Sequence, residues 1–185
     1  MTLTADNIMI AVGGRPSIPQ IPGGEHCISS DGFFALDKQP KSVAVVGGGY
    51  IGVELAGVFK ALGTDTHLFT RAAKPLKEFD GMIVDALMAE MKKQELLHIP
   101  NQEPASVEKG GDGRLMIKTT TGERFGPYDQ VVMAVGRRPL VEPLQLDRAG
   151  VKLDKKGFIA VDAFQATSVE GVFALGLLSV PVLLV

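Results

Sequence analysis

The chain has 185 residues, 45% apolar and 22% charged, a composition typical of a folded globular protein rather than a disordered one. Its 19 Lys and Arg against 21 Asp and Glu give no basic excess for nucleic-acid binding, and one cysteine, Cys27, excludes an internal disulfide framework. With no apolar run of the ~20 residues that a membrane helix needs and no recognisable signal peptide, we expect no membrane partner and a cytoplasmic location.

The first segments are short. Residues 7–12 (NIMIAV) read as a buried strand that ends at Gly13 and Gly14. The prolines of residues 16–22 (PSIPQIP) favour an extended backbone, because each proline fixes its own φ and biases the residue before it away from helix. Residues 30–34 (SDGFF) are expected to form a short helix.

The centre of the chain carries the clearest pattern. Residues 42–46 (SVAVV) predict a buried strand, and residues 50–62 place apolar side chains at helical spacing. Gly63 ends that helix, and residues 66–70 predict a second strand, with Asp65 in the turn before it. Strand, helix and strand in this order form a βαβ unit, which implies a parallel sheet covered by helices and an α/β fold class.

The rest of the chain predicts one more helix and several strands. Asp80 is expected to cap a helix whose apolar side chains, Met91 among them, pack in the core. Residues 105–108 and 115–119 flank the turn sequence Gly110–Gly113 and predict a β-hairpin. Residues 130–135 read as a buried strand that ends at Gly136, and residues 151–175 as short strands and turns.

A glycine loop joins the first strand of the βαβ unit to its helix. Gly47, Gly49 and Gly52 match G-x-G-x-x-G in the strand–turn–helix context that makes this pattern specific for dinucleotides. Gly47 permits the tight turn, Gly49 lets the backbone approach a pyrophosphate, and Gly52 allows close packing of helix and strand. The helix N-terminus adds free N–H groups for the phosphates. The alternative is a glycine-rich turn without a ligand.

The end of the second strand indicates which dinucleotide would bind. NAD sites of this kind have an acidic residue there for the ribose hydroxyls, whereas this strand ends at Thr70 and is followed by Arg71, Lys74 and Lys77. Cations attract a 2′-phosphate that a carboxylate would repel, so the sequence favours NADPH. The alternative reading of Arg71 and Lys77 is solvated surface charge.

Two further side chains share the helix face next to the loop. Glu54 follows Tyr50 by one turn and would orient a cation or a carboxamide, while Tyr50 would cover the ring end of the nucleotide; the alternatives are an exposed helix glutamate and a packed aromatic. We predict no catalytic residue and no metal site, because Cys27 has no partner cysteine and His26, His67 and His98 lack ligand spacing.

Residues 41–71 (KSVAVVGGGYIGVELAGVFKALGTDTHLFTR) resemble the NADPH-binding domain of the pyridine-nucleotide disulfide oxidoreductases. The resemblance extends over roughly residues 3–176 and includes VMAVGRRP and GFIAVDAFQATSVEGVFALG. THLFTR with the later PLKEFD is most similar to the glutathione reductases of that family. The resemblance implies a Rossmann-like FAD/NAD(P)-binding fold, a parallel sheet with helices and an antiparallel β-hairpin layer.

The resemblance also implies roles for matching residues. Gly47, Gly49 and Gly52 would form the pyrophosphate turn, Tyr50 would act as a lid over a nicotinamide pocket that Ile51 lines, and Glu54 would lie beside the nicotinamide. Arg71 and Lys77 would bind the 2′-phosphate. Gly136 would approach the cofactor through its backbone, and Gly13 stands where the family has a segment near FAD.

The likeness implies four segments: residues 1–38 from an FAD domain and its connection, 39–140 as the NADPH-binding domain, 141–176 as the return to the FAD domain, and 177–185 as a divergent apolar tail. The implied activity passes electrons from NADPH to FAD, to a cysteine pair and to glutathione disulfide. The family's cysteine pair, catalytic His and homodimer region have no counterpart here, so we expect a truncated chain that is inactive alone, with an organellar address left open. The alternatives are a stand-alone NADPH-binding module or a regulatory fragment.

Overall fold

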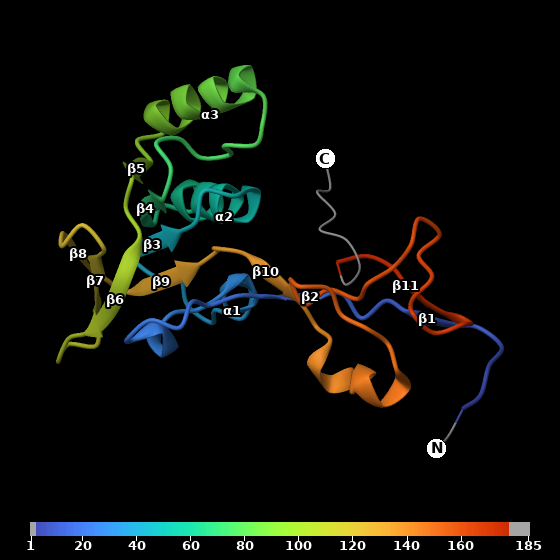
Figure 1. Cartoon of the computed structure of the whole chain (residues 1–185). Coiled ribbons are helices and arrows are strands. Elements are labelled where there is room, and N and C mark those ends of the chain that lie inside the picture. The colour runs from blue at the N-terminus through green and yellow to red at the C-terminus, as the bar shows by residue number, and fades with distance from the viewer. Residues whose placement is uncertain (1–2, 178–185) are drawn as a thin grey trace. The chain divides into compact units, whose positions relative to one another are not determined.

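The computed structural model describes residues 3–177 (Figure 1). The chain divides into two compact units. One contains residues 16–136, and the other combines the segment before residue 16 with the segment from residue 137 onward. Each unit is described by itself below.

A four-stranded parallel sheet forms the centre of the 16–136 unit. Its order is β5 (Leu97–Pro100), β4 (Asp65–Thr70), β3 (Ser42–Val46) and β9 (Gln130–Met133). Every residue of β3 is buried, as expected for a central parallel strand that is covered on both faces. All pairings are parallel, so the carboxyl ends of the strands lie at one edge of the sheet.

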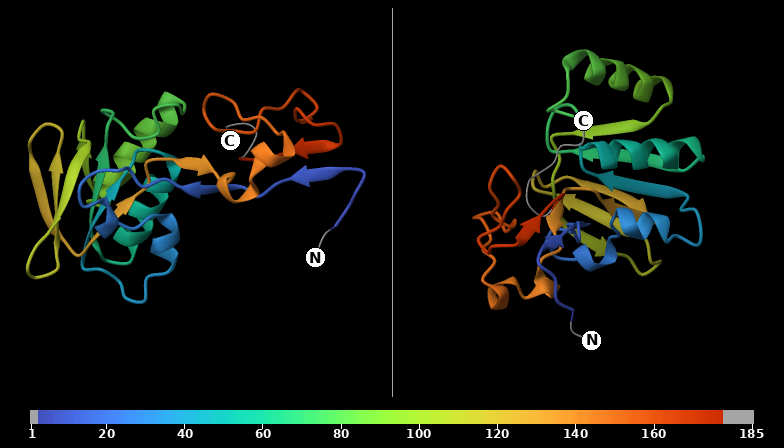
Figure 2. Two further views of the ribbon diagram at one scale, coloured as in Figure 1. Left: turned by 60° about the horizontal axis from the view of Figure 1, so that its bottom comes forward. Right: turned by 90° about the vertical axis from the view of Figure 1, so that its right-hand side faces the viewer.

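Helices cover one face of this sheet (Figure 2). The long helices are α2 (Tyr50–Ala61) and α3 (Gly81–Lys93), and α1 (Ser30–Phe34) is short. Val43 and Val45 of β3 point toward the helix side, where they pack with Leu55 and Phe59 of α2. The Asp80 side chain caps α3 by accepting a hydrogen bond from the Met82 backbone N–H at 2.8 Å, as the sequence predicted.

An antiparallel sheet covers the opposite face. Its strands are β6 (Pro104–Lys109), β7 (Leu115–Thr119) and β8 (Arg124–Tyr128), in that order. Successive side chains of a strand point to opposite faces, so Ala44 and Val46 lie on this side and pack in a core with Ile117 and Tyr128. The unit therefore has three layers: helices, parallel sheet and antiparallel sheet (Figure 2).

The second unit contains only short strands and 3₁₀ helices among its described residues. β1 (Ile8–Ile10) pairs in parallel with β11 (Val172–Ala174), and β2 (Gly14–Pro16) pairs with β10 (Arg137–Pro139). Two 3₁₀ helices, η2 (Glu142–Leu144) and η3 (Leu146–Ala149), follow β10. A third 3₁₀ helix, η1 (Gly24–His26), belongs to the larger unit. A small core forms around Leu146, Val151, Ile159 and Ala174.

The α/β class, the parallel sheet and the antiparallel layer are confirmed, together with the βαβ unit and the hairpin. Some boundaries were wrong. Asp65 is the first residue of β4 rather than part of the preceding turn, because it pairs with Ser42 at the start of β3. The first strand covers only Ile8–Ile10, since only those residues pair with β11. β5 and β8 were not expected, because both are short and carry proline.

Candidate dinucleotide site

The glycine loop lies at the carboxyl end of β3 and leads directly into α2. Gly47 has φ +133°, a backbone conformation that residues with a side chain rarely adopt. A Cβ at this position would also lie 2.2 Å from the Ala134 carbonyl oxygen. A Cβ at Gly52 would lie 2.0 Å from the Gly47 carbonyl oxygen. The first turn of α2 therefore packs directly against the loop backbone, and both positions require glycine.

Gly49 differs from these two glycines. A Cβ at Gly49 would meet no atom within 4 Å, so the space next to it is open. Gly49 is the N-cap of α2 and has no side chain to accept from the first-turn N–H groups. Open space beside donors at the positive end of a helix dipole fits a pyrophosphate.

The segment that follows β4 is tied to this loop. The Leu76 backbone N–H donates to the Gly48 carbonyl oxygen at 2.7 Å. The Thr70 methyl group lies close to Gly48, since a Cβ added there would be 3.1 Å from Thr70 Cγ2. The structure thus brings the glycine loop and the cation-bearing segment, which are separated by α2 in the sequence, to one edge of the sheet.

Arg71 is the first residue after β4 and is exposed. Within residues 3–177 no carboxylate lies within ion-pair distance of its guanidinium. The neighbouring lysines differ: Lys74 Nζ contacts Asp85 Oδ1 at 2.6 Å, and Lys77 Nζ contacts Glu78 Oε1 at 3.1 Å. Arg71 is therefore the cation of this segment with its charge available for a ligand.

The residues predicted to lie near the nicotinamide ring of the nucleotide are in the first turns of α2. Tyr50 is 49% exposed and Glu54 is exposed, and the two residues are one turn apart on the helix. Ile51 is half-buried and packs against the core between α2 and the sheet. The first two side chains are thus available to a ligand, whereas much of Ile51 is used in packing.

Gly136 follows β9 in the 16–136 unit, and its carbonyl oxygen accepts from the Ser17 N–H at 2.9 Å. A Cβ there would meet nothing within 4 Å. Gly13 belongs to the other unit, where its carbonyl oxygen accepts from the Leu140 N–H at 3.1 Å. Nine of the ten predicted site residues therefore belong to one unit, and Gly13 does not.

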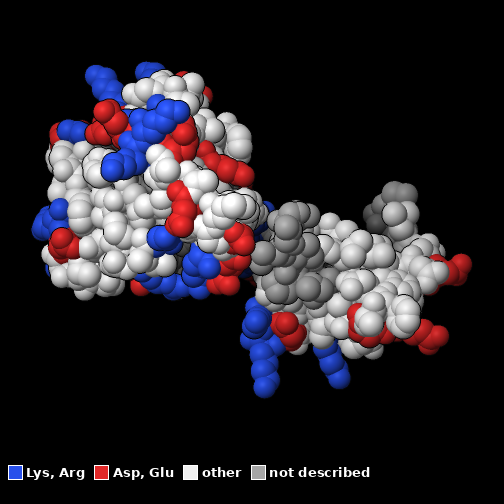
Figure 3. Space-filling view, turned by 90° about the horizontal axis from the view of Figure 1, so that it is seen from above, with Lys and Arg blue, Asp and Glu red and all other residues white. Residues whose placement is uncertain are grey.

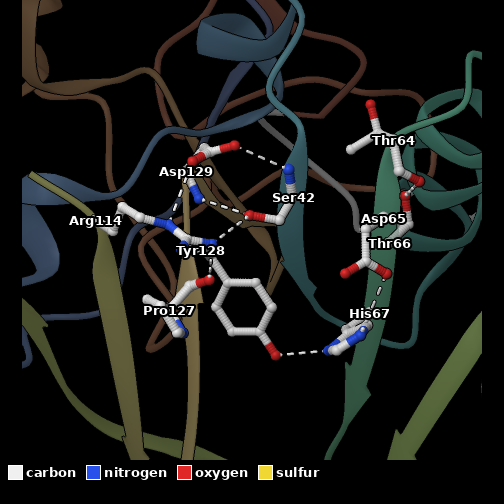
Figure 4. A network of polar contacts seen from close by, with 9 residues as sticks. All are labelled: Ser42, Thr64, Asp65, Thr66, His67, Arg114, Pro127, Tyr128 and Asp129. Atoms are coloured by element: carbon white, nitrogen blue, oxygen red, sulfur yellow. Dashed lines mark hydrogen bonds and ion pairs between the residues drawn. The ribbon is translucent and has the colours of Figure 1, made fainter.

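A polar network occupies the opposite edge of the parallel sheet (Figure 4). Tyr128 and His67 point toward one another from β8 and β4, with 2.7 Å between the Tyr128 hydroxyl and His67 Nδ1. Asp129 Oδ2 accepts from the backbone N–H groups of Lys41 and Ser42 at 2.8 and 3.0 Å. Burial lowers the pKa of His67 and raises that of Tyr128, so both are neutral at pH 7. The network joins the two sheets.

The only cysteine is shielded from reaction. Cys27 is 6% exposed and packs in the core between the two sheets. Burial, with a smaller contribution from Glu25, raises the pKa of its thiol to about 12. Because the thiolate is the reactive form, Cys27 is not suited to redox chemistry in the folded chain.

No group of His, Cys, Asp and Glu in the described part of the chain has the arrangement of a metal site. Helices of residues 3–177 are all too short or too polar to cross a membrane. On the face seen in Figure 3, cationic and anionic side chains are interspersed.

A parallel βαβ unit with its glycine loop at the carboxyl edge defines the dinucleotide-binding class of α/β proteins. Comparison with known sequences narrows the class. Residues 1–178 match the family described as pyridine nucleotide-disulphide oxidoreductase, and the chain belongs to that family.

Curated relatives support this membership. Glutathione reductase of Schizosaccharomyces pombe is 47% identical over 175 residues, and that of Yarrowia lipolytica is 43% identical over 175 residues. A pea protein named glutathione reductase, chloroplastic/mitochondrial, is 39% identical over 173 residues. Each match covers 94% of this chain but only 38%, 37% and 31% of the relative. The chain thus spans about a third of the length of the curated relatives it matches.

Solved structures share the fold. The flavoprotein disulfide reductase RclA of Escherichia coli superposes with a TM-score of 0.86 at 25% identity, covering 94% of this chain and 40% of RclA. LpdA of Mycobacterium tuberculosis superposes with a TM-score of 0.87 at 24% identity, covering 96% of this chain and 39% of LpdA. The predicted Rossmann-like fold of this family is confirmed.

Sequence reasoning missed two residues next to the site. Leu76 connects the cation segment to Gly48 through its backbone N–H, and no sequence signal marks such a bond. His98 on β5 contacts Thr70 at the end of β4, 2.7 Å from ring nitrogen to hydroxyl. That contact depends on the pairing of β4 with β5, a strand that the sequence did not predict.

Proposed function

We propose that the chain is the NADPH-binding portion of an FAD-dependent disulfide reductase, and that glutathione disulfide is the substrate of the complete enzyme. The observation that carries the proposal is Arg71, an exposed cation without an ion partner among residues 3–177, beside an open glycine loop. A carboxylate at the end of β4 would favour NADH, and Thr70 stands there instead. The family and the glutathione reductase relatives support the substrate.

Each site residue has a role in this proposal. The backbone at Gly49 and the first turn of α2 would bind the pyrophosphate, with Gly47 and Gly52 shaping the loop. Arg71 would bind the 2′-phosphate by charge-assisted hydrogen bonds. Lys77 would contribute a second positive charge once its ion pair with Glu78 is broken. Bound NADPH supplies a hydride for the reduction of a flavin.

The remaining residues would act at the nicotinamide end and at the flavin. Tyr50 would cover the nicotinamide, Ile51 and Glu54 would lie beside it, and the Gly136 backbone would approach the cofactor. Gly13 would lie near FAD in the complete enzyme. These five roles rest on the family resemblance, with support from the exposure of Tyr50 and Glu54.

The segment roles belong to the same proposal. Residues 39–140 would bind NADPH, whereas residues 1–38 and 141–176 would belong to an FAD domain and its connections. The apolar tail is residues 177–185, and all of it after Leu177 lies outside the described residues. A cytoplasmic location stays a prediction, and the name of the pea relative keeps an organellar one open.

A second candidate is a stand-alone NADPH-binding or regulatory chain without catalysis. The single buried Cys27 favours it, because the chain then has no dithiol to reduce a disulfide. Flavin absorbance of the purified chain tests the second candidate, whereas a colourless chain is compatible with both. We expect a colourless chain that does not reduce glutathione disulfide; stoichiometric flavin would show that the chain binds FAD by itself and would contradict the second candidate.

The test of the proposed function is a titration of the 185-residue chain with NADPH and with NADH, followed by nicotinamide fluorescence. We expect saturable binding of both and tighter binding of NADPH by about tenfold or more, the size of a charge-assisted phosphate contact. Equal affinities would contradict the phosphate role of Arg71, and failure to bind either nucleotide would contradict the proposed function itself.

A further inference from the structure

The Thr70 hydroxyl connects three parts of the larger unit. Thr70 is 1% exposed and is the last residue of β4. Its Oγ1 donates to the Ala72 carbonyl oxygen at 2.7 Å and lies 2.7 Å from His98 Nε2. Its methyl group lies against Gly48 of the glycine loop. The side chain thus touches the glycine loop, strand β5 and the segment that contains Arg71.

The direction of the second hydrogen bond follows from counting protons. A hydroxyl carries one hydrogen, and Thr70 uses it on the Ala72 carbonyl oxygen, which can only accept. Thr70 Oγ1 must therefore accept from His98, which requires the proton of the imidazole to be on Nε2. The one proton of the Thr70 hydroxyl is then donated to Ala72, and one of its two lone pairs accepts from His98.

The backbone on both sides of Arg71 is held by the two residues that follow β5, Asn101 and Gln102. The Gln102 N–H, just after β5, donates to the Thr70 carbonyl oxygen at 3.0 Å. The Ala72 carbonyl oxygen accepts a hydrogen bond from the Thr70 hydroxyl and a longer one, at 3.5 Å, from the Asn101 backbone N–H. Arg71 sits between these two anchored peptides, so its Cα position is set before a ligand binds. A cation that is already in place loses less entropy on binding a phosphate.

We propose that His98 is a positioning residue for Arg71, and that through the Thr70 hydroxyl it increases discrimination between NADPH and NADH. This inference rests on the proposed function. His98 itself would touch no nucleotide; it would act by keeping the Thr70–Ala72 backbone in the shape that presents Arg71. Loss of the Nε2–H donor would remove one of the two hydrogen bonds that hold the Thr70 hydroxyl, and with it the side-chain link between β5 and the Thr70–Ala72 segment.

The test measures dissociation constants of the full chain for NADPH and NADH and compares their ratio between variants. His98→Leu removes the donor, and we expect the NADH-to-NADPH ratio of dissociation constants to fall about three- to tenfold, the effect of one lost hydrogen bond. His98→Gln can still donate through its amide, so we expect the ratio to recover. Thr70→Val removes the shared hydroxyl, and combining it with His98→Leu should add little to either variant alone.

His67→Leu is the matched control. It removes a histidine–hydroxyl contact of the same 2.7 Å length, His67 to Tyr128, from the same strand but near the opposite edge of the sheet. We expect it to lower stability without changing the ratio. An unchanged ratio in both His98→Leu and Thr70→Val, in a chain that prefers NADPH, would overturn this inference alone. A wild-type chain that binds no nucleotide would overturn the proposed function as well.

Discussion

At the scale of single residues, two neighbours at the end of β4 determine the proposed nucleotide preference. Thr70 is buried and its hydroxyl is engaged by Ala72 and His98, so it offers nothing to a ribose. Arg71 is exposed and unpaired within the described part of the chain. An NAD-type site has the opposite arrangement, an available carboxylate at the strand end.

Reversing the charge of Arg71 tests the proposed preference for NADPH over NADH. Arg71→Glu should weaken NADPH binding by about tenfold or more, because a charge-assisted contact of ~1.5–3 kcal/mol is replaced by repulsion. NADH binding should change much less, since NADH has no 2′-phosphate. Fluorescence titration of the variant with both nucleotides measures the difference.

Lys92→Glu is the control for that variant. Lys92 is an exposed residue in the last turn of α3, so its reversal changes the net charge equally without touching the segment after β4. Equal weakening of NADPH binding in the two variants would identify a general charge effect and contradict the assignment of Arg71.

At the scale of elements, α2 contains two glycines with opposite demands. A Cβ at Gly52 would lie 2.0 Å from the Gly47 carbonyl oxygen, whereas a Cβ at Gly57 would meet nothing within 4 Å. Gly52→Ala should lower the free energy of unfolding by about 2 kcal/mol or more through overpacking. Gly57→Ala should raise it by about 1 kcal/mol, because alanine is the better helix former. Urea unfolding measures the free energy of unfolding of the two variants. Destabilisation by Gly57→Ala as well as by Gly52→Ala would contradict the open space that the structure has next to Gly57.

The contact between β4 and β8 predicts how stability depends on pH. Burial lowers the pKa of His67 below its ordinary 6.5, against the opposing influence of Asp65 and with a smaller lowering by Lys60. The unfolded chain then binds more protons than the folded chain, so this stability is present above about pH 6.5 and is lost as the pH falls below it. His98 has a pKa lowered in the same direction by burial.

Urea unfolding at about pH 7.5 and 5.5 measures this dependence. The wild-type chain should be less stable at the lower pH, and His67→Phe should reduce the difference. A pH dependence that is unchanged in the variant would show that His67 does not contribute, and that the loss comes from other groups.

Local signals predicted the βαβ unit well, because the apolar run of β3, the glycines after it and the periodicity of α2 all lie within one short segment. β5 was missed since four residues that include His98 and Pro100 lack a strand pattern, and they form a strand only beside β4. Lys77 was predicted as a ligand cation from its charge, and its pairing with Glu78 depends on the backbone path of the loop. Contacts such as Thr70 with His98 require strand register, which sequence alone did not provide.

At the scale of the whole molecule, the two units differ in how they are stabilised. β3 is buried throughout between two layers, whereas β1 and β11 form a two-stranded sheet that leaves Ile8 and Met9 more than half exposed. Isolated two-stranded sheets are marginally stable. Amide protons of Ser42–Val46 should therefore exchange with solvent far more slowly than those of Ile8–Ile10. Equal protection, measured by hydrogen exchange, would contradict independent stability of the units.

The most direct test of the central claim is a map of amide chemical shifts during titration of the ¹⁵N-labelled chain with NADPH and with NADH. Both nucleotides should shift the amides of Gly47, Gly49 and Gly52, since both carry the pyrophosphate. Only NADPH should produce a large shift at Arg71, where the 2′-phosphate would bind. Shifts centred instead on Tyr128 and His67 at the opposite edge of the sheet, or an identical response of Arg71 to both nucleotides, would contradict the account.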